Sequence, residues 1–356
     1  MLPEVLAEFI ATEQRCPANP ASSHAAGRSA RGALEQARER IANLFDLPAG
    51  DVVFTSGGTE AANLAVRGLG DSRLPVLLAD VEHPAVRESA ERRGACKWQI
   101  DAHGAAVVAE PTELIGLVCL VHAQSELGTL QDTAAAIEVA RNCDVPVLID
   151  AAQSLGRVPI QELVAKGAVV ALSPHKAGGL RGHGVLLGRR LESKLQPLML
   201  GGGQEFGLRP GTQSPSLAAA NALAIELACT EQAQRAQAMA RNRKAFLDGL
   251  GTRSCVFRVL TPLGNSVPNT VMLCFEDVEG RNLLPALDLA GVQASHGSAC
   301  SSGSMTAPRI LTAIGVDDAQ ARACVRFSFD WQNREVACAH VGTLVGDVML
   351  RLRKKN

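Results

Sequence analysis

The chain has 356 residues, of which 47% are hydrophobic and 20% are charged, which is typical of a globular protein with one large domain or two domains. A net charge of −1 gives no overall attraction to nucleic acid or to an anionic membrane surface. No run approaches about 18 consecutive apolar residues, and the start, Met1-Leu2-Pro3-Glu4-Val5, lacks the basic region of a signal peptide. We therefore expect no membrane span.

The ten cysteines include no C-x-x-C pair, so we expect no metal site. Cys119, Cys274 and Cys324 lie in apolar runs, where a free thiol packs as a small hydrophobic side chain. This cysteine usage predicts a reducing, cytoplasmic location. Tyrosine is absent, which removes one common catalytic acid or base.

Apolar runs alternate with helical patterns through the first two thirds of the chain. Strands are predicted over residues 52–54, 74–79, 114–121, 145–149, 169–172 and 185–187, with a helix from Thr59 to about Arg67. Continuous runs of Val, Ile and Leu are typical of strands that are buried on both faces of a mostly parallel sheet. The spacing between the runs leaves room for crossover helices.

The last third predicts a second, smaller α/β domain. Residues 215–250 are rich in Ala, Gln, Glu and Arg and predict one long helix. Short strands are then predicted over 270–275, 293–295 and 324–329, with a helix over 280–289.

A lysine and an aspartate follow two of the apolar runs, 26 residues apart. Lys176 lies in Ser173-Pro174-His175-Lys176, and Asp150 ends Val147-Leu148-Ile149-Asp150. A desolvated amine can react with an aldehyde, and a carboxylate can pair with the protonated ring nitrogen of pyridoxal phosphate. Taken singly, Lys176 could instead extend to water, and Asp150 could cap a helix or a turn.

A glycine turn follows the first predicted strand. In Ser56-Gly57-Gly58-Thr59-Glu60, glycines let the backbone approach an anion, and the helix start stabilises its charge. Thr59 could equally be a plain N-cap without a ligand. His83 follows the second strand and could lie on a planar cofactor or simply at the surface.

Two further residues stand out in the last third. Cys300 lies among small polar residues over 295–304, which predicts an accessible thiol that could be a nucleophile or a tolerated surface cysteine. Arg326 lies inside the apolar run 324–329. It could bind a carboxylate, form an internal salt bridge, or face outward.

Ten segments in one order resemble the cysteine desulfurases, in the class-V aminotransferase group of fold type I pyridoxal-phosphate enzymes. The resemblance extends from about Asn19 to about Ser328. The matching segments are residues 19–24, 54–60, 82–86, 126–131, 150–153, 173–176, 201–205, 209–212, 297–302 and 326–328. It implies a large domain over 14–245 with a mostly parallel seven-stranded sheet flanked by helices, and a small domain made of 1–13 and 246–356.

The resemblance also assigns roles at the cofactor. Lys176 would hold the cofactor aldehyde, Asp150 would pair with the ring nitrogen, and Gln153 would bond to the ring hydroxyl. His83 would stack on the ring and move protons. The phosphate would be held at the Gly58 turn by side chains of Thr59, Ser173, His175 and, from the second subunit of a homodimer, Thr212.

For the reaction, Arg326 would bind the substrate carboxylate, and Cys300 would take sulfur from L-cysteine as a persulfide and pass it to an acceptor protein. The implied function is a pyridoxal-phosphate-dependent sulfurtransferase, a cysteine desulfurase that releases L-alanine. The alternatives are a selenocysteine lyase, a β-eliminating C–S lyase, and a catalytically silent sulfur-transfer scaffold.

Three departures from the family pattern are expected to matter. The 18 residues before Asn19 do not match the family's opening strand, so we expect a shortened N-terminus. Gln124-Ser125 replaces a pair of asparagines, which changes a cofactor contact at Ser125. Phe206 stands where the family often has arginine, and His296 precedes the cysteine motif, where it could lower the pKa of Cys300 or bind an acceptor.

Overall fold

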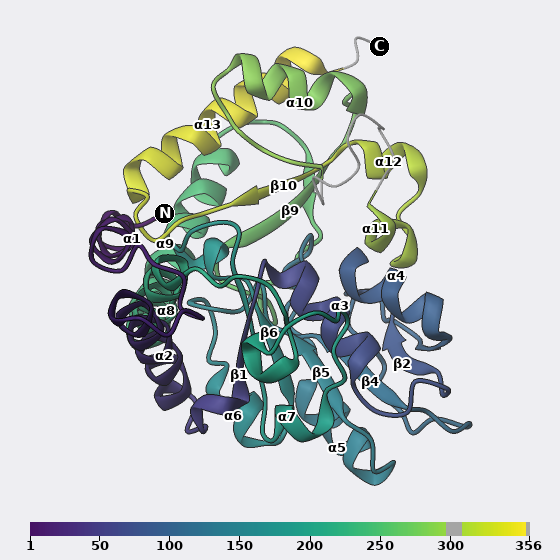
Figure 1. The fold of residues 1–356 in the computed structure, drawn as a ribbon. Coiled ribbons are helices and arrows are strands. Elements are labelled where there is room, and N and C mark those ends of the chain that lie inside the picture. The colour runs from purple at the N-terminus through teal and green to yellow at the C-terminus, as the bar shows by residue number, and fades with distance from the viewer. Residues whose placement is uncertain (297–307, 354–356) are drawn as a thin grey trace. The chain divides into compact units, whose positions relative to one another are not determined.

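The computed structural model describes residues 1–296 and 308–353, which form two compact units (Figure 1). Unit 1 comprises residues 1–98, 108–122 and 132–232. Unit 2 comprises residues 99–107 and 123–131 and the chain from Ala233 onward. No helix in the described ranges is long and apolar enough to cross a membrane.

Unit 1 is built on a seven-stranded sheet with the order β1-β7-β6-β5-β4-β2-β3. Strands β6, β5, β4, β2 and β3 run parallel to one another, and β7 is antiparallel to both β6 and β1. This confirms the mostly parallel sheet. The strands are β1 (Val52–Thr55), β2 (Val76–Ala79), β3 (Ala95–Trp98), β4 (Leu117–Val121), β5 (Val147–Asp150), β6 (Val169–Leu172) and β7 (Gly184–Leu187).

Helices flank this sheet, because the strands are apolar on both faces. Leu64 of α3 and Val86 of α4, for example, lie in one buried cluster with Leu117 and Leu148 of the sheet. The helices of unit 1 are α1 (Pro3–Arg15), α2 (Ala25–Leu44), α3 (Gly58–Gly68), α4 (Pro84–Arg93), α5 (Thr133–Asn142), α6 (Gln161–Ala165), α7 (Leu191–Lys194) and α8 (Pro215–Thr230), with 3₁₀ turns η1 (Ala49–Asp51), η2 (Pro174–Ala177) and η3 (Gln204–Gly207).

Unit 2 contains a three-stranded antiparallel sheet with the order β10-β9-β8. One face of the sheet packs into an apolar cluster that includes Phe246, Leu273, Val325 and Phe327. The elements are α9 (Gln232–Gly251), β8 (Phe257–Val259), β9 (Thr270–Phe275), α10 (Gly280–Leu289), α11 (Arg309–Ala313), α12 (Asp318–Arg322), β10 (Cys324–Ser328) and α13 (Glu335–Leu352).

The division of the chain differs from the expected one at the N-terminus. Residues 1–13 were predicted with the small domain, yet α1 lies against α8 within unit 1. The Leu2 N–H donates to the Gly178 carbonyl at 2.8 Å, and Ser216 donates to Glu13. The two units also separate near Gln232 rather than at residue 245.

Two predicted elements also differ, and one observed strand was not predicted. Residues 215–250 form two helices, because the chain turns at Glu231, beside which Gln232 donates to the Arg157 carbonyl at 2.8 Å. Residues 293–295 contribute only one isolated bridge, between Ser295 and Arg326. Strand β3 was not predicted, since its residues are partly exposed at a sheet edge and give no continuous apolar run.

Each unit contains one of the two tryptophans of the chain. Trp98 in β3 is buried, and its Nε1–H donates to the Ala109 carbonyl at 2.7 Å. Trp331, which follows β10, lies under the Arg235 guanidinium, whose carbon is 4.1 Å from the ring centroid.

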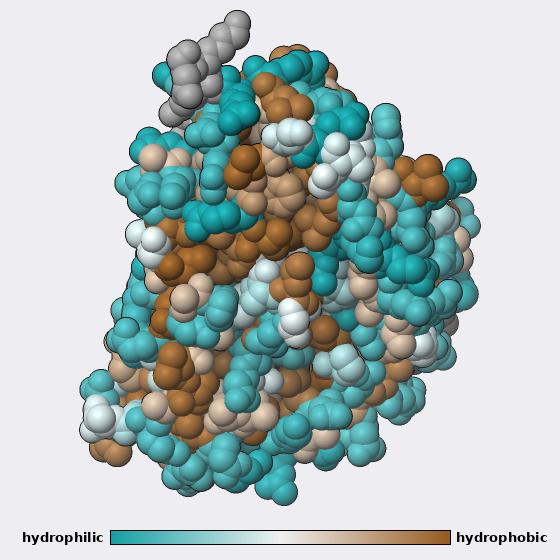
Figure 2. All heavy atoms as spheres, turned by 180° about the vertical axis from the view of Figure 1, so that it is seen from behind, coloured by the Kyte–Doolittle hydropathy of each residue, from teal (hydrophilic) through white to brown (hydrophobic). Residues whose placement is uncertain are grey.

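Large hydrophobic side chains are also exposed on unit 1. Leu198, Met199 and Leu200 form one such run, and Leu200 is 88% exposed. Figure 2 shows hydrophobic areas on the face of the molecule turned away in Figure 1.

Candidate active site

At the turn between β1 and α3, no side chain caps the first N–H groups of the helix. Gly57 is the N-cap of α3 and provides no side-chain cap. Thr59 is therefore inside the helix, and the alternative that made it the N-cap is wrong. A Cβ on Gly58 would lie 2.1 Å from the Ser173 Oγ, so only glycine allows this close approach. The turn thus brings Gly58 next to Ser173.

An ion pair links this turn to the segment that carries Thr212. Glu60 accepts the Ser56 N–H at 2.6 Å and pairs with Arg209, whose Nε is 2.8 Å from Oε1. Burial raises the pKa of Glu60, but the bonds from Arg209 and Ser56 outweigh burial and lower it overall. Thr212 lies three residues beyond Arg209 and is exposed.

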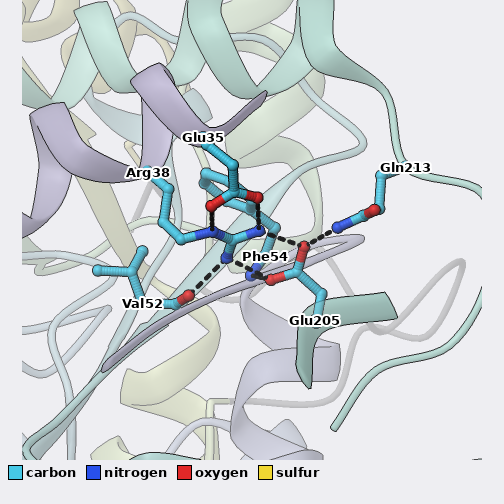
Figure 3. Close-up of polar contacts among 6 residues, drawn as sticks. All are labelled: Glu35, Arg38, Val52, Phe54, Glu205 and Gln213. Carbon is cyan, nitrogen blue, oxygen red and sulfur yellow. Dashed lines mark hydrogen bonds and ion pairs between the residues drawn. The ribbon is translucent and has the colours of Figure 1, made fainter. Parts of the chain in front are cut away.

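A second, fully buried ion pair holds the same segment (Figure 3). Arg38 Nη1 is 2.6 Å from Glu205 Oε2 and Nη2 is 2.9 Å from Oε1, and each side chain is 1% exposed. The Phe54 N–H of β1 also donates to Glu205, at 2.8 Å. Glu205 and Phe206 have φ values of +48° and +58°, a left-handed conformation that is strained for residues other than glycine.

Asp150 lies at the carboxyl end of β5, near the middle of the sheet of unit 1. It pairs in register with Val121 of β4 and Ala171 of β6, so the ends of three parallel strands meet there. The carboxylate is 8% exposed, and Oδ1 accepts the Ala152 N–H at 2.9 Å. This bond is the turn contact that the alternative for Asp150 predicted.

Lys176 lies in η2, directly after β6, and is half-buried. Arg157 connects it to the turn after β5, since Nη2 donates to the Lys176 carbonyl at 3.0 Å and Nη1 to the Gln153 carbonyl at 2.8 Å. His175 is exposed, and burial of part of its ring together with the charges of Lys176 and Arg181 lowers its pKa. Arg157 therefore holds the backbone at Gln153 close to the backbone at Lys176.

His83 is the N-cap of α4. Its Nδ1 accepts the Ala85 N–H at 3.1 Å, so the neutral ring carries its proton on Nε2. The contact fixes the orientation of the ring.

Two titratable residues beside Asp150, the buried Glu82 and the half-buried His122, received no role from the sequence. Burial, together with the nearby Asp150 charge, raises the pKa of Glu82 to about 8, although its Oε1 accepts the Val121 N–H at 2.7 Å. Burial lowers the pKa of His122 to about 4, and the His122 N–H donates to the Asp150 carbonyl at 2.9 Å. Both follow apolar strands, which is the signal that could have singled them out.

Arg326 lies in β10 of unit 2, and one of its N–H groups has no hydrogen-bond partner in the described part of the chain. Its Nη1 donates to the Ser125 carbonyl at 2.9 Å, while its buried Nε finds no hydrogen-bond partner among the described residues. Burial lowers the pKa of Arg326, although the negative charge of Glu126 acts in the opposite direction. Ser125 Oγ in turn donates to Glu126 at 2.6 Å. An unpartnered buried guanidinium N–H is costly unless an anion binds it, which favours the carboxylate-binding prediction.

Cys300 lies outside the described residues, so its role stays a prediction. His296, four residues earlier, has Nδ1 2.7 Å from the Cys324 carbonyl oxygen. A carbonyl only accepts, so Nδ1 carries a proton there.

The fold is that of a known protein family, and comparison with known proteins identifies it. The aminotransferase class-V family model matches residues 1–337, and the chain belongs to that family.

Curated proteins named cysteine desulfurase are among the relatives of the chain. Cysteine desulfurase IscS of Vibrio cholerae is 36% identical over 327 residues, which cover 87% of this chain and 80% of the relative. A solved NifS-like protein superposes with a TM-score of 0.88 at 26% identity, over 99% of this chain and 97% of that one. The structure of SspA in complex with cysteine gives a TM-score of 0.79 at 26% identity, over 93% and 96% of the two chains.

Proposed function

We propose that the chain is a pyridoxal-phosphate-dependent cysteine desulfurase. It converts L-cysteine to L-alanine and carries the sulfur as a persulfide on Cys300 to an acceptor protein. The names of its relatives support the activity, and the cysteine bound to SspA supports the substrate class.

The observation that carries the proposal is the cluster of groups at the strand ends of unit 1. The cofactor needs three groups: a buried carboxylate, here Asp150; an amine, here Lys176, whose backbone carbonyl Arg157 links to the Gln153 turn; and the Gly58 turn against Ser173. A Cβ on Gly58 would meet the Ser173 Oγ at 2.1 Å, so a glycine here lets the turn approach the serine that would hold the phosphate. When bound, pyridoxal phosphate supplies an electron sink for the charge that develops at the substrate α-carbon.

The residues of the chain have separate tasks. Lys176 would hold the cofactor aldehyde, Asp150 would keep the ring nitrogen protonated, and Gln153 would bond to the ring hydroxyl. His83 would stack on the ring and hold or release a proton at Nε2, because Nδ1 is occupied by the Ala85 N–H. The phosphate would be held by Thr59, Ser173 and His175, with Thr212 from a second subunit.

In unit 2, Arg326 would bind the substrate carboxylate through the Nε that has no partner among the described residues, while Nη1 keeps its bond to Ser125. The carbonyl of Ser125 thereby orients the guanidinium.

The sulfur transfer itself belongs to Cys300. Its thiolate attacks the sulfur of L-cysteine, a new S–S bond forms, and the bond between that sulfur and the β-carbon breaks. The β-carbon then takes up a proton. The balance is one L-cysteine and one protein thiol in, one L-alanine and one protein persulfide out.

We also propose a homodimer in the cytoplasm. The exposed run Leu198-Met199-Leu200 lies shortly before the segment that carries Thr212, and a second copy of the chain would cover it. The cysteines in the described part of the chain are free thiols, which supports a reducing location.

The test is a comparison of products from the wild type and Cys300→Ala. With L-cysteine, the wild type should form alanine and a persulfide on the Cys300 peptide, because the thiolate accepts the sulfur. Cys300→Ala should lose both, yet keep the visible absorption of the bound cofactor.

Cys143→Ala is the matched control, since Cys143 is a partly exposed free cysteine and should be dispensable. Sulfide and pyruvate from Cys300→Ala at the wild-type rate would show a β-eliminating lyase instead. Alanine formation that survives in Cys300→Ala would remove the central residue of the proposal.

A further inference from the structure

Two cysteines of unit 2 lie directly opposite each other on neighbouring strands. Cys274 of β9 and Cys324 of β10 are register partners, and both side chains are buried. Both Sγ atoms lie near one acceptor, the Gln320 carbonyl of α12, at 3.7 Å and 3.3 Å. The two thiols are close enough to shift each other's pKa.

The register places this pair at the position that a cross-strand disulfide requires. The neighbouring pair, Phe275 and Ala323, is joined by a hydrogen bond from the Phe275 N–H to the Ala323 carbonyl at 3.0 Å. Hydrogen-bonded and non-hydrogen-bonded pairs alternate along an antiparallel ladder, so Cys274 and Cys324 form a non-hydrogen-bonded pair. Such pairs have Cα atoms about 4.5 Å apart, within the range of about 4.4–6.8 Å that disulfides span.

The surroundings of the two thiols are polar on one side. Alternation along the strands puts Cys274 and Cys324 on the face opposite Leu273, Phe275 and Val325, which pack in the apolar core. The thiols are covered by Arg258 and Gln320, which are both exposed and joined at 3.0 Å. They therefore lie one side chain below the surface.

The same contacts favour ionisation of one thiol. A hydrogen bond from Cys324 lowers the pKa of Cys274 to about 7, with help from the Arg258 charge, against burial and the Glu276 carboxylate. The Arg258 Nη2 is 3.9 Å from the Cys274 Sγ. The bond to Cys274 and burial raise the pKa of Cys324, and Asp317 adds to the rise.

From this geometry we propose that Cys274 and Cys324 form a thiol oxidation site that closes to a disulfide when a peroxide reacts with it. The Cys274 thiolate attacks one peroxide oxygen, the O–O bond breaks, and one water leaves, giving a sulfenic acid. The Cys324 sulfur then attacks the Cys274 sulfur, an S–S bond forms, and a second water leaves. Two thiols are oxidised, and one hydrogen peroxide is reduced to two waters.

Peptide mapping of the full-length protein tests this site directly. Trypsin places Cys274 in residues 259–281 and Cys324 in residues 323–326, and neither peptide contains another cysteine. The native protein is treated with hydrogen peroxide at neutral pH, its remaining thiols are alkylated, and it is digested without reductant. We expect the two peptides joined, with the mass of two hydrogens lost, before Cys119 of the unit 1 sheet reacts.

The variants separate the site from general oxidation. Cys324→Ser should abolish the joined peptide and leave Cys274 as a sulfenic or sulfinic acid. Cys338→Ser, which removes another buried cysteine of unit 2, should leave the joined peptide intact. Arg258→Gln should slow its formation several-fold, because the thiolate loses the nearby positive charge. Trypsin then releases Cys274 within residues 254–281, which also contain Cys255, so this variant is made together with Cys255→Ser and compared with Cys255→Ser alone.

Several outcomes would overturn the proposal. One is that both thiols remain alkylatable at peroxide doses that oxidise Cys119. Another is a joined peptide that forms equally well in urea-unfolded protein, which would mean that the native register does not direct it. Peptide mapping does not depend on desulfurase activity. The proposed oxidation site can therefore be confirmed or refuted independently of the proposed function.

Discussion

Glu82 shows what burial does to a single carboxyl group. It is 4% exposed, and its Oε2 has no partner among the described residues. Burial, opposed by the Val121 N–H and reinforced by Asp150, raises the pKa to about 8 from an ordinary value of 4.5. Glu82 is therefore protonated at neutral pH in the folded state, while it is ionised in the unfolded chain.

This difference predicts a pH-dependent loss of stability. Below pH 4.5 Glu82 is protonated in both the folded and the unfolded state, so its raised pKa does not make the free energy of unfolding depend on pH. Between about pH 4.5 and 8 only the folded state keeps the proton, so the free energy of unfolding falls by about 1.4 kcal/mol per pH unit from this group and then levels off. Glu82→Gln mimics the protonated acid, so its stability relative to the wild type should rise across this window in denaturant titrations.

Glu88→Gln is the matched control, since Glu88 on α4 has a side chain that is 67% exposed. It should follow the wild type at every pH. Parallel curves for Glu82→Gln and the wild type from pH 4.5 to 8 would show that Glu82 ionises normally in the folded protein.

At the residue scale, the sequence predicted the groups that follow conspicuous apolar strands. Asp150 and Lys176 were found because a charge after a buried strand is visible in the sequence. Glu82 and His122 were given no role, because their burial beside Asp150 depends on the order of the strands in the sheet. Thr59 was misread as a possible N-cap, since Gly57 begins the helix instead.

At the element scale, two ion pairs anchor the segment that carries η3. Burial alone would lower the pKa of Arg38, but the hydrogen bonds and charge of Glu205 more than offset it and raise the pKa overall. The bond from Glu205 to the Phe54 N–H ties η3 to β1, and the pair holds Glu205 and Phe206 in their strained conformation.

Removing one partner should therefore cost more than removing both. Glu205→Met leaves the Arg38 guanidinium buried with only Glu35 and a carbonyl, and we expect a loss of about 3–5 kcal/mol in the free energy of unfolding. Arg38→Met should lower the free energy of unfolding by a similar amount, because it leaves the buried Glu205 carboxylate without its positive partner. The double variant should be more stable than either single one, as measured in a double-mutant cycle by chemical denaturation.

Arg73→Met is the control for this cycle, since its pair with Asp71 is exposed and should contribute little. Strictly additive losses in the double variant would mean that the Arg38–Glu205 pair is not coupled in solution.

The sequence predicted elements well where apolar runs were continuous and poorly where context decides. Strand β6 and helix α10 were predicted with their observed bounds. The break between α8 and α9 was missed, because Glu231 and Gln232 favour helix as much as their neighbours do. Helix α8 ends at Thr230, close to the boundary between the two units.

At the scale of the whole molecule, the proposed homodimer makes a prediction about Thr212. If Thr212 serves the site of the other subunit, a mixed dimer of Lys176→Ala with Thr212→Val has one site with both defects and one intact site. Alanine formation should then recover to about half of the wild-type value per dimer. Co-expression with two affinity tags isolates the mixed dimer.

The matched control carries the same two substitutions on one subunit, paired with a wild-type subunit. Each site then has one defect, and alanine formation should stay low. The opposite ranking of the two mixed dimers would show that Thr212 serves its own subunit.

The two-unit organisation has a spectroscopic consequence. With no tyrosine in the chain, intrinsic protein fluorescence comes from two tryptophans, Trp98 in unit 1 and Trp331 in unit 2. Trp98 is enclosed in the sheet, whereas Trp331 is stacked beneath the Arg235 cation, so the two indoles emit from different environments. Trp98→Phe leaves a fluorophore in unit 2 alone, and Trp331→Phe leaves one in unit 1 alone. Each half of the molecule thus carries its own optical reporter, without any added label.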